Sequence, residues 1–224
     1  MAATELTETT VRYLFATAWL PCDPKDHTVP VPGGATTALD TAGSLLHIAL
    51  WNLRRQGLME FEQLREVEDE PARVLGGRSF SRFKLLATTA ELRGLEGALL
   101  RAAGSVKDVE GWLQRGTRWA SDEDDHGLRR LIRELDLGNR SPWSTVCNHC
   151  LSEAHAAGLV AIKGRLFKKV VFTDVAAVES LRGRHDELRA ARAVYMEAEP
   201  ELSTAVASDC LRTVLDAYNP NLGD

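Results

Sequence analysis

Long apolar runs are missing from this sequence, since no uninterrupted stretch approaches the roughly 20 apolar residues that a membrane-spanning helix needs. Cysteine is also scarce, with four in 224 residues, and the opening MAATELTETT lacks the apolar segment of a signal peptide. We therefore expect a cytoplasmic protein with reduced thiols, whose contact with a membrane would be peripheral.

An excess of positive charge is missing as well. The formal net charge is −5, whereas proteins that bind nucleic acid through bulk charge carry a basic footprint. Apolar residues make up 44% and charged residues 26%, which is typical of a globular protein with a substantial core. The composition disfavours nucleic acid as a partner but leaves room for local basic patches.

Catalytic signatures are absent too. The chain has no GxSxG, no HExxH and no standard phosphate-binding glycine loop, and the run VPGGATT lacks the lysine that such a loop needs. Its six histidines are scattered, and the acidic run SDEDDH lacks the ligand spacing of a calcium loop. We therefore expect a protein that is not an enzyme and has no cofactor.

The motif CNHC, with Cys147 and Cys150, invites a metal or redox interpretation. Zinc needs four ligands, usually from two such pairs, and the sequence has no second pair. Val146, Cys147, Cys150 and Ala154 follow one helical face, so both thiols should lie on the core side. We interpret them as small packing residues without a metal.

Hydrophobic periodicity predicts a mainly α fold. Ser141 suits a helix N-cap, Pro142 suits the first helical position and Gly158 suits a helix end. The predicted helices cover residues 7–19, 39–56, 89–103, 105–115, 128–135, 142–157, 174–197 and 200–218. The predicted apolar faces include Val11, Leu14 and Phe15 in the first helix, Leu45, Leu46, Ile48, Ala49 and Leu53 in the second, and Val206, Cys210, Val214 and Ala217 in the last.

Two regions repeat one order of elements. WNLRRQGLMEFEQL…FSRFKLLATTAELRG and CLSEAHAAGLVAIKGRLFKKVVFTDVAAVESLRG each give helix, Gly-Leu, strand, turn, strand, Thr, and a helix with Leu-Arg-Gly. The repeat spans residues 45–103 and 143–197, and two copies are too few for a solenoid. We predict a single compact helical domain over residues 1–224, with two small β-hairpins in winged-helix-like helix–hairpin–helix units.

Winged helices often bind DNA, so a tandem winged-helix transcription regulator is one functional hypothesis. The second hairpin is basic, with Lys163, Arg165, Lys168 and Lys169. The helix that would enter the major groove has Thr145, Asn148, His149, Ser152 and Glu153 on its expected outward face, and no Lys or Arg. A recognition helix without a cation disfavours this hypothesis, and basic residues on edge strands also discourage aggregation.

The succession of segments resembles the Golgi phosphoprotein 3 family, in particular bacterial members of the actinobacterial type. The resemblance covers nearly the whole chain and rests on LLHIALWNLRRQGLMEFE, LEGALLRAAGSVKDVEGWLQRGTRW, LSEAHAAGLV…RLFKKVVFTD and STAVASDCLRTVLDAY, in that order. It implies a mostly α-helical, non-enzymatic domain that binds the phosphatidylinositol 4-phosphate headgroup at a membrane surface. In eukaryotic members it also implies an adaptor role toward the tails of membrane proteins.

The resemblance implies a headgroup pocket with two arginines one helical turn apart, after a Trp-containing hairpin. TRW supplies Trp119, and HGLRRLIREL supplies Arg129, Arg130 and Arg133. Arg129 and Arg133 would share a helix face, and bidentate guanidinium–phosphate contacts would allow an acidic protein to bind phosphate. These four residues are the predicted lipid-headgroup-binding site, and the alternative is a solvated helix face.

A second register is also open, because counting back from Gly158 puts Ser144 and Cys147 at the two arginine positions. The sequence also departs from the family in two places. The other Trp and Arg of the family's pocket have no match in VPVPGGATTALDTAG. The family's apolar membrane-inserting hairpin corresponds here to a loop with four acids, Asp122, Glu123, Asp124 and Asp125, which an anionic leaflet would repel. The expected partners are thus an anionic lipid headgroup or membrane surface, and a protein partner.

Overall fold

The computed structural model describes residues 6–18, 35–65, 79–86, 92–105, 131–132, 134–135, 142–163 and 169–218. Over these residues the chain is mainly α-helical, which confirms the predicted fold class. The helices are α1 (Glu8–Ala18), α2 (Ala35–Arg55), α3 (Gly94–Ser105), α6 (Pro142–Ala156), α7 (Val175–Ser180), α8 (Arg182–Glu197) and α9 (Pro200–Tyr218). The strands are β1 (Met59–Arg65), β2 (Ser79–Leu85), β3 (Val160–Lys163) and β4 (Lys169–Phe172).

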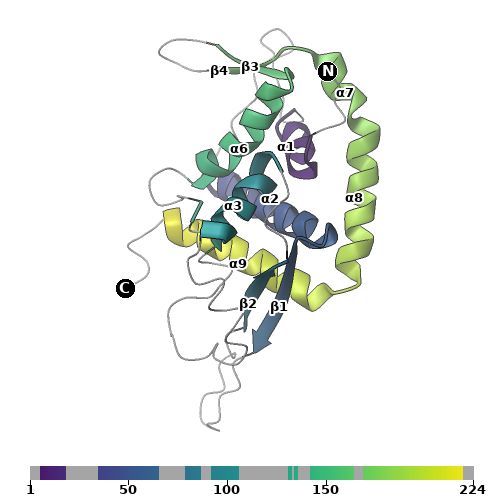
Figure 1. The fold of residues 1–224 in the computed structure, drawn as a ribbon. Helices are drawn as coiled ribbons and strands as arrows, with labels where there is room; N and C mark the ends of the chain where they lie inside the picture. Colours follow the sequence, from purple (N-terminus) through teal and green to yellow (C-terminus); the bar gives the residue numbers. More distant parts are fainter. Residues whose placement is uncertain are drawn as a thin grey trace.

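Helix α2 lies at the centre of the core. It contacts α1, α3, α6 and α9, and Figure 1 shows it crossing the middle of the molecule, with α9 running below it. Leu46, Leu50, Trp51 and Leu53 are each at most 1% exposed, so α2 is buried on more than one face. The helix approaches α9 closely at Gly43, where a Cβ atom would lie 3.3 Å from the Leu211 backbone. The absence of a side chain there lets the two helices pack tightly.

The predicted apolar faces are confirmed wherever the structure describes their side chains. The buried residues include Val11, Leu14 and Phe15 of α1, Leu45, Leu46, Ile48, Ala49 and Leu53 of α2, and Val206, Cys210 and Val214 of α9. Burying a large aliphatic side chain contributes about 1.5–3 kcal/mol, so these faces account for much of the driving force for folding.

The two predicted hairpins are both present. Strand β1 pairs antiparallel with β2 from Met59–Leu85 to Arg65–Ser79, and β3 pairs antiparallel with β4 from Val160–Phe172 to Lys163–Lys169. The hairpins lie at opposite ends of the molecule in Figure 1. Phe61 and Phe83, which face each other across the first hairpin, are buried in the main core, so this hairpin is part of the packed domain.

Both hairpins are joined to the preceding helix by the same backbone geometry. Gly57 ends α2 and Gly158 ends α6, with φ of 68° and 75°. In each unit the glycine N–H donates to the carbonyl three residues back, and the following leucine N–H donates to the carbonyl five residues back, at 2.9–3.0 Å. This pair of bonds is a Schellman motif, which favours glycine because of its left-handed φ. The residue after the second strand then donates its N–H to the carbonyl of Leu58 or Leu159.

The prediction of one continuous helix over residues 174–197 is wrong. This segment forms two helices, α7 and α8, which are separated by Leu181. Asp174 caps α7, since its Oδ1 accepts a 2.9 Å hydrogen bond from the Ala177 N–H. The break allows Val178 and Leu181 to be buried in a second core cluster, whereas α8 has no buried residue and runs along one side of the molecule (Figure 1).

Helix α1 connects the two core clusters. Its Tyr13 belongs to the main cluster around α2, whereas Val11, Leu14 and Phe15 pack with residues of α6, β3 and α7 in the second. It also contacts α3 and α8. The first turn of α1 is therefore surrounded by elements that are distant in sequence, and several buried polar residues gather there.

Candidate functional site

The four residues predicted to bind a lipid headgroup, Trp119, Arg129, Arg130 and Arg133, lie outside the residues that the structure describes. Their role therefore stays a prediction. Three apolar residues of the same sequence segment are described, and Leu131, Ile132 and Leu135 are all buried in the main core. The segment is thus attached to the core at these positions, while the Glu134 side chain is exposed.

The alternative register places one of the two pocket positions at Cys147, which is 4% exposed and packs in the main core. A side chain in this environment is not available to a headgroup. Cys150 is fully buried, and burial raises the pKa of both thiols. The prediction that these cysteines are core residues is confirmed. Within the described part of the chain, no cluster of three or more His, Cys, Asp and Glu side chains could hold a metal ion.

The prediction of which α6 residues point outward, toward DNA, is partly wrong. Asn148 and Ser152 are exposed as expected, but Thr145 and Glu153 are buried at 7% and 5% exposure. Glu153 lies three residues after buried Cys150 and therefore on the inward side. In the basic hairpin, the Lys163 side chain is exposed, whereas Arg165 and Lys168 lie outside the described residues.

The buried carboxylate of Glu153 binds the first turn of α1. Its Oε1 accepts a 2.8 Å hydrogen bond from the Thr7 N–H, and its Oε2 accepts from the hydroxyls of Thr7, at 2.7 Å, and Thr10. Thr7 also caps the helix, because its Oγ1 accepts from the Thr10 N–H at 3.3 Å. A negative charge at this end is favourable, since the helix dipole is positive there.

A second buried carboxylate, that of Glu96 on α3, binds the next residue of the same turn. Its Oε1 accepts hydrogen bonds from the Thr9 hydroxyl at 2.6 Å and from the Asn52 amide at 3.0 Å. Its Oε2 has no hydrogen-bond partner. Glu96 is 1% exposed, and burial raises its pKa against the lowering effect of these hydrogen bonds.

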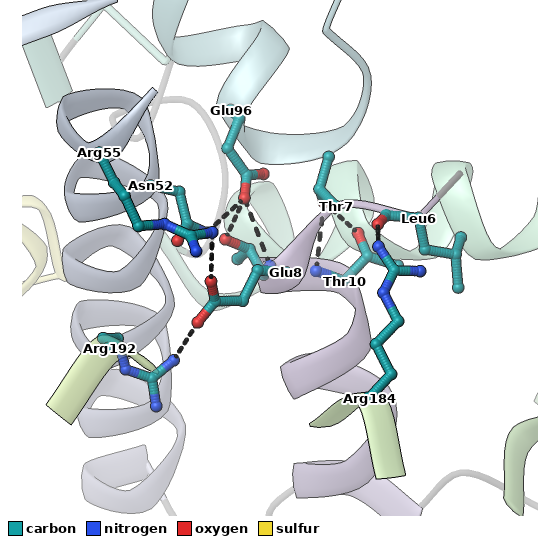
Figure 2. Close-up of polar contacts among 10 residues, drawn as sticks. Leu6, Thr7, Glu8, Thr10, Asn52, Arg55, Glu96, Arg184 and Arg192 are labelled. Carbon is teal, nitrogen blue, oxygen red and sulfur yellow. Dashed lines mark hydrogen bonds and ion pairs between the residues drawn. The ribbon is translucent and has the colours of Figure 1, made fainter. Parts of the chain in front are cut away.

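The third buried carboxylate, Glu8, belongs to α1 and links it to two other helices. Oε1 accepts from Arg192 of α8 at 2.7 Å, and Oε2 accepts from Arg55 of α2 at 3.2 Å. Figure 2 shows Glu8 between these two arginines, with Asn52 beside Arg55 on α2 and Glu96 above the turn. Burial raises the pKa of Glu8, while both guanidinium groups act to lower it. The backbone just before the helix is also held, because Arg184 donates to the Leu6 carbonyl at 2.6 Å.

Gly94 makes room for this arrangement. It has a positive φ of 61°, and a Cβ atom built on it would overlap Oε2 of Glu153. A side chain at this position would therefore push the carboxylate away from α1, in addition to straining the backbone. The same Cβ would also lie 3.1 Å from the Thr7 hydroxyl. The three carboxylates and Gly94 together form a structural clamp on α1.

Arginines outnumber acids on the side of this clamp that faces α8. His185, Arg189 and Arg192 are four and three residues apart on α8, so they lie on one helix face. Both ends of this row contact α1, because Arg12 Nη1 lies 3.3 Å from His185 Nε2 and Arg192 is paired with Glu8. We call Arg12, Arg189 and Arg192 the α1–α8 arginine cluster.

Within the part of the chain that the structure describes, acids do not balance the charges in this cluster. Among the described residues, Glu8 pairs with Arg192 and Arg55, and no ion pair forms at Arg12 or Arg189. Arg12 is half-buried and Arg189 is exposed. Burial, and then the charges of Arg192 and Arg189, lower the pKa of Arg12. A group of this kind can bind an anion, and it is the best-defined candidate site in the described part of the molecule.

Sequence reasoning did not find the carboxylate clamp or the arginine cluster. Three threonines within the four residues 7–10, at a helix start, were a signal that buried acceptors would be needed. The partners Glu96 and Glu153 lie more than 80 residues further along the chain, and only the fold brings them together. The arginine cluster likewise combines residues from α1 and α8.

No known protein family, curated protein or solved structure matches this chain at a significant level. Within the described residues, no helix is both long enough and apolar enough to cross a membrane. The functional conclusions below therefore depend on the residues and contacts of this chain, and on the resemblance drawn from its sequence segments.

Proposed function

We propose that this protein is a non-enzymatic, peripheral membrane protein that resembles Golgi phosphoprotein 3 and binds phosphoinositide or other anionic lipid headgroups. In this proposal Arg129, Arg130 and Arg133 contact the phosphate and Trp119 rests at the membrane interface. An adaptor role toward a protein partner is part of the same proposal.

The observation that carries the proposal is the order in which the resembling segments build the core. LLHIALWNLRRQGLMEFE includes the second half of α2 and the first part of β1, LSEAHAAGLV…RLFKKVVFTD includes the end of α6 and reaches both strands of the second hairpin, and STAVASDCLRTVLDAY forms most of α9. These elements contact one another around α2. A resemblance that coincides with the packed elements is better support than short motifs at unrelated positions would be.

Vesicle flotation tests the proposal. The full chain is incubated at low salt with phosphatidylcholine vesicles, with and without phosphatidylinositol 4-phosphate. We expect flotation that depends on the anionic lipid and weakens with added salt, because surface charges are screened within about 10 Å at 0.1 M salt. No binding at low salt would refute the lipid function.

The predicted residues are tested in the same assay. We expect the double substitution Arg129→Ala, Arg133→Ala to reduce flotation strongly. The matched control is Arg212→Ala, which removes a charge from an exposed position of α9. If the double variant floats like the control, lipid binding is retained but the proposed site is wrong.

The alternative function, a tandem winged-helix transcription regulator, makes a different prediction. It requires salt-dependent DNA binding through Lys163, Arg165, Lys168 and Lys169. The described exposed residues of α6 give it no support, because none of them is Lys or Arg. A gel-shift experiment with the host's own upstream DNA at low salt decides the matter, and an unshifted band retires this alternative.

A further inference from the structure

The α1–α8 arginine cluster brings cationic side chains of two helices to one junction. Arg189 lies between two points where α8 contacts α1, namely the His185–Arg12 contact and the Arg192–Glu8 ion pair. It is exposed, while Arg12 is half-buried, so the cluster opens to solvent on one side and is closed by protein on the other. An anion could therefore enter without a rearrangement of the helices.

Arg12 contacts a histidine ring of α8. Its Nη1 lies 3.3 Å from His185 Nε2, and His185 Nδ1 lies 3.1 Å from Asp186 Oδ1. Its ring also stacks on Phe15, with centroids 4.7 Å apart, which holds it in place. Arg12 thus contacts a ring nitrogen there and not a carboxylate.

Carboxylate partners are unevenly distributed around the cluster. Glu8 pairs with Arg55 and Arg192, which engage both of its oxygens. Asp186 lies against His185. Among the described residues, Arg12 and Arg189 therefore have no carboxylate partner, and guanidinium groups bind planar or tetrahedral oxyanions bidentately.

We propose that Arg12, Arg189 and Arg192 form a binding site for a phosphate-bearing anion at the junction of α1 and α8. A phosphate monoester carries up to two negative charges and three acceptor oxygens, which matches the two unpaired guanidinium groups better than the single charge of a carboxylate. The site does not depend on the lipid function proposed above, because it uses other residues. A phosphate group could come from a soluble molecule or from a lipid headgroup.

The first experiment uses inorganic phosphate as the probe. The thermal unfolding midpoint is measured while phosphate replaces chloride at constant ionic strength, and the concentration dependence gives an apparent Kd by linkage. We expect the midpoint of the wild type to rise with phosphate. In Arg189→Gln the apparent Kd should increase about tenfold or more, because a charge-assisted hydrogen bond is lost.

Two further variants make the result specific. Arg12→Gln should weaken phosphate binding as Arg189→Gln does, but it alters a half-buried position, so the exposed Arg189 gives the cleaner test. Arg212→Gln removes the same charge from an exposed position on α9 and should bind phosphate as the wild type does. The proposal is overturned if the wild type shows no phosphate-specific rise, or if Arg212→Gln loses as much affinity as Arg189→Gln.

A vesicle experiment distinguishes the two sources of phosphate. Wild type and Arg189→Gln are compared in flotation with phosphatidylcholine vesicles that contain phosphatidylinositol 4-phosphate. If Arg189→Gln loses affinity for free phosphate and also for these vesicles, the site binds a lipid headgroup. If it loses affinity only for free phosphate, the site serves a soluble phosphorylated molecule. Both results support the site, and failure of flotation in every variant refutes only the lipid function.

Discussion

At the scale of single residues, Glu96 is buried and His47 is half-buried, and the pH dependence of stability that follows from this has opposite signs for the two groups. Glu96 is a carboxyl group with one unpartnered oxygen, so its neutral form is favoured in the fold. A carboxyl group whose pKa is raised on folding stabilises the protein at low pH, and this contribution is lost as the pH rises through the folded-state pKa.

We predict that Glu96→Gln removes this pH dependence. The amide keeps the acceptor for Thr9 and Asn52 but never ionises, so the wild type should lose stability relative to the variant as the pH rises above the ordinary pKa of glutamate. Urea unfolding at several pH values measures the difference. Glu187→Gln, at an exposed position of α8, is the control and should run parallel to the wild type. If the free energy of unfolding of Glu96→Gln varied with pH in the same way as that of the wild type, the ionisation of Glu96 would carry no cost in stability, and the prediction would be wrong.

For His47, folding stability changes with pH in the opposite direction. Its Nε2 accepts a 2.6 Å hydrogen bond from the Trp51 indole, and burial followed by the charge of Arg192 lowers its pKa to about 4. The unfolded chain takes up the proton first, so the contribution of His47 is present above pH 6.5 and is lost as the pH falls toward 4.

For His47 we expect about 2 kcal/mol of stability to disappear between pH 7 and pH 5. His47→Gln keeps an acceptor for Trp51 but cannot take up a proton, so the variant should lose about 2 kcal/mol less than the wild type over this interval. Urea unfolding of both proteins at the two pH values provides the comparison. An equal loss in both would mean that other groups cause the acid sensitivity.

At the scale of the elements, the two helix–hairpin units offer a matched set of glycines. Gly57 and Gly158 have positive φ and open space around them, whereas Gly183 in α8 has open space without positive φ. Alanine at Gly57 or Gly158 should therefore destabilise the protein by about 1 kcal/mol through backbone strain alone. Alanine at Gly183 should stabilise it by about 0.5–1 kcal/mol, because alanine favours the helix. Chemical denaturation of the three variants gives these values, and a destabilising Gly183→Ala would contradict the argument.

The elements were also what the sequence predicted best. Pro142, Gly158, Asp174 and Pro200 mark helix boundaries that the structure reproduces to within two residues, because caps and glycine ends depend on local backbone chemistry. The break at Leu181 was missed, since no Pro or Gly stands at the break itself and burial in the second core cluster determines it. A boundary between helix and loop is determined by nearby residues, whereas the interruption at Leu181 is determined by packing against the rest of the fold.

The candidate site was harder to predict than the elements. The residues chosen by resemblance, from Trp119 to Arg133, lie outside the described structure, and the α1–α8 arginine cluster was not found. Glu153 was expected at the surface and is buried, because the threonines of α1 satisfy its carboxylate. Such pairings depend on contacts across more than 140 residues, which periodicity within one segment does not contain.

At the scale of the whole molecule, three buried thiols report on unfolding. Cys147 and Cys150 of α6 and Cys210 of α9 all pack in the main core, and burial raises the pKa of each. A thiol with a raised pKa and no access to solvent reacts slowly, because the thiolate is the nucleophile.

These three cysteines should therefore be unreactive toward a thiol reagent in the native protein and should become reactive together in urea. Mass spectrometry after pulsed alkylation follows each site separately. Coincident labelling curves for α6 and α9 are expected if the main core unfolds as one cooperative unit. Labelling of Cys210 at lower urea than Cys147 would show that α9 detaches first.

The clamp on α1 has a consequence for how this chain can change over evolutionary time. Any residue but glycine at position 94 would displace Glu153, and loss of Glu153 would leave the Thr7 and Thr10 hydroxyls without their shared acceptor. A substitution at one of these positions is therefore destabilising unless the others change with it. In descendants of this sequence, the four positions should be inherited or replaced as a set, and a glycine lost alone at position 94 would mark a lineage in which α1 has been rebuilt or discarded.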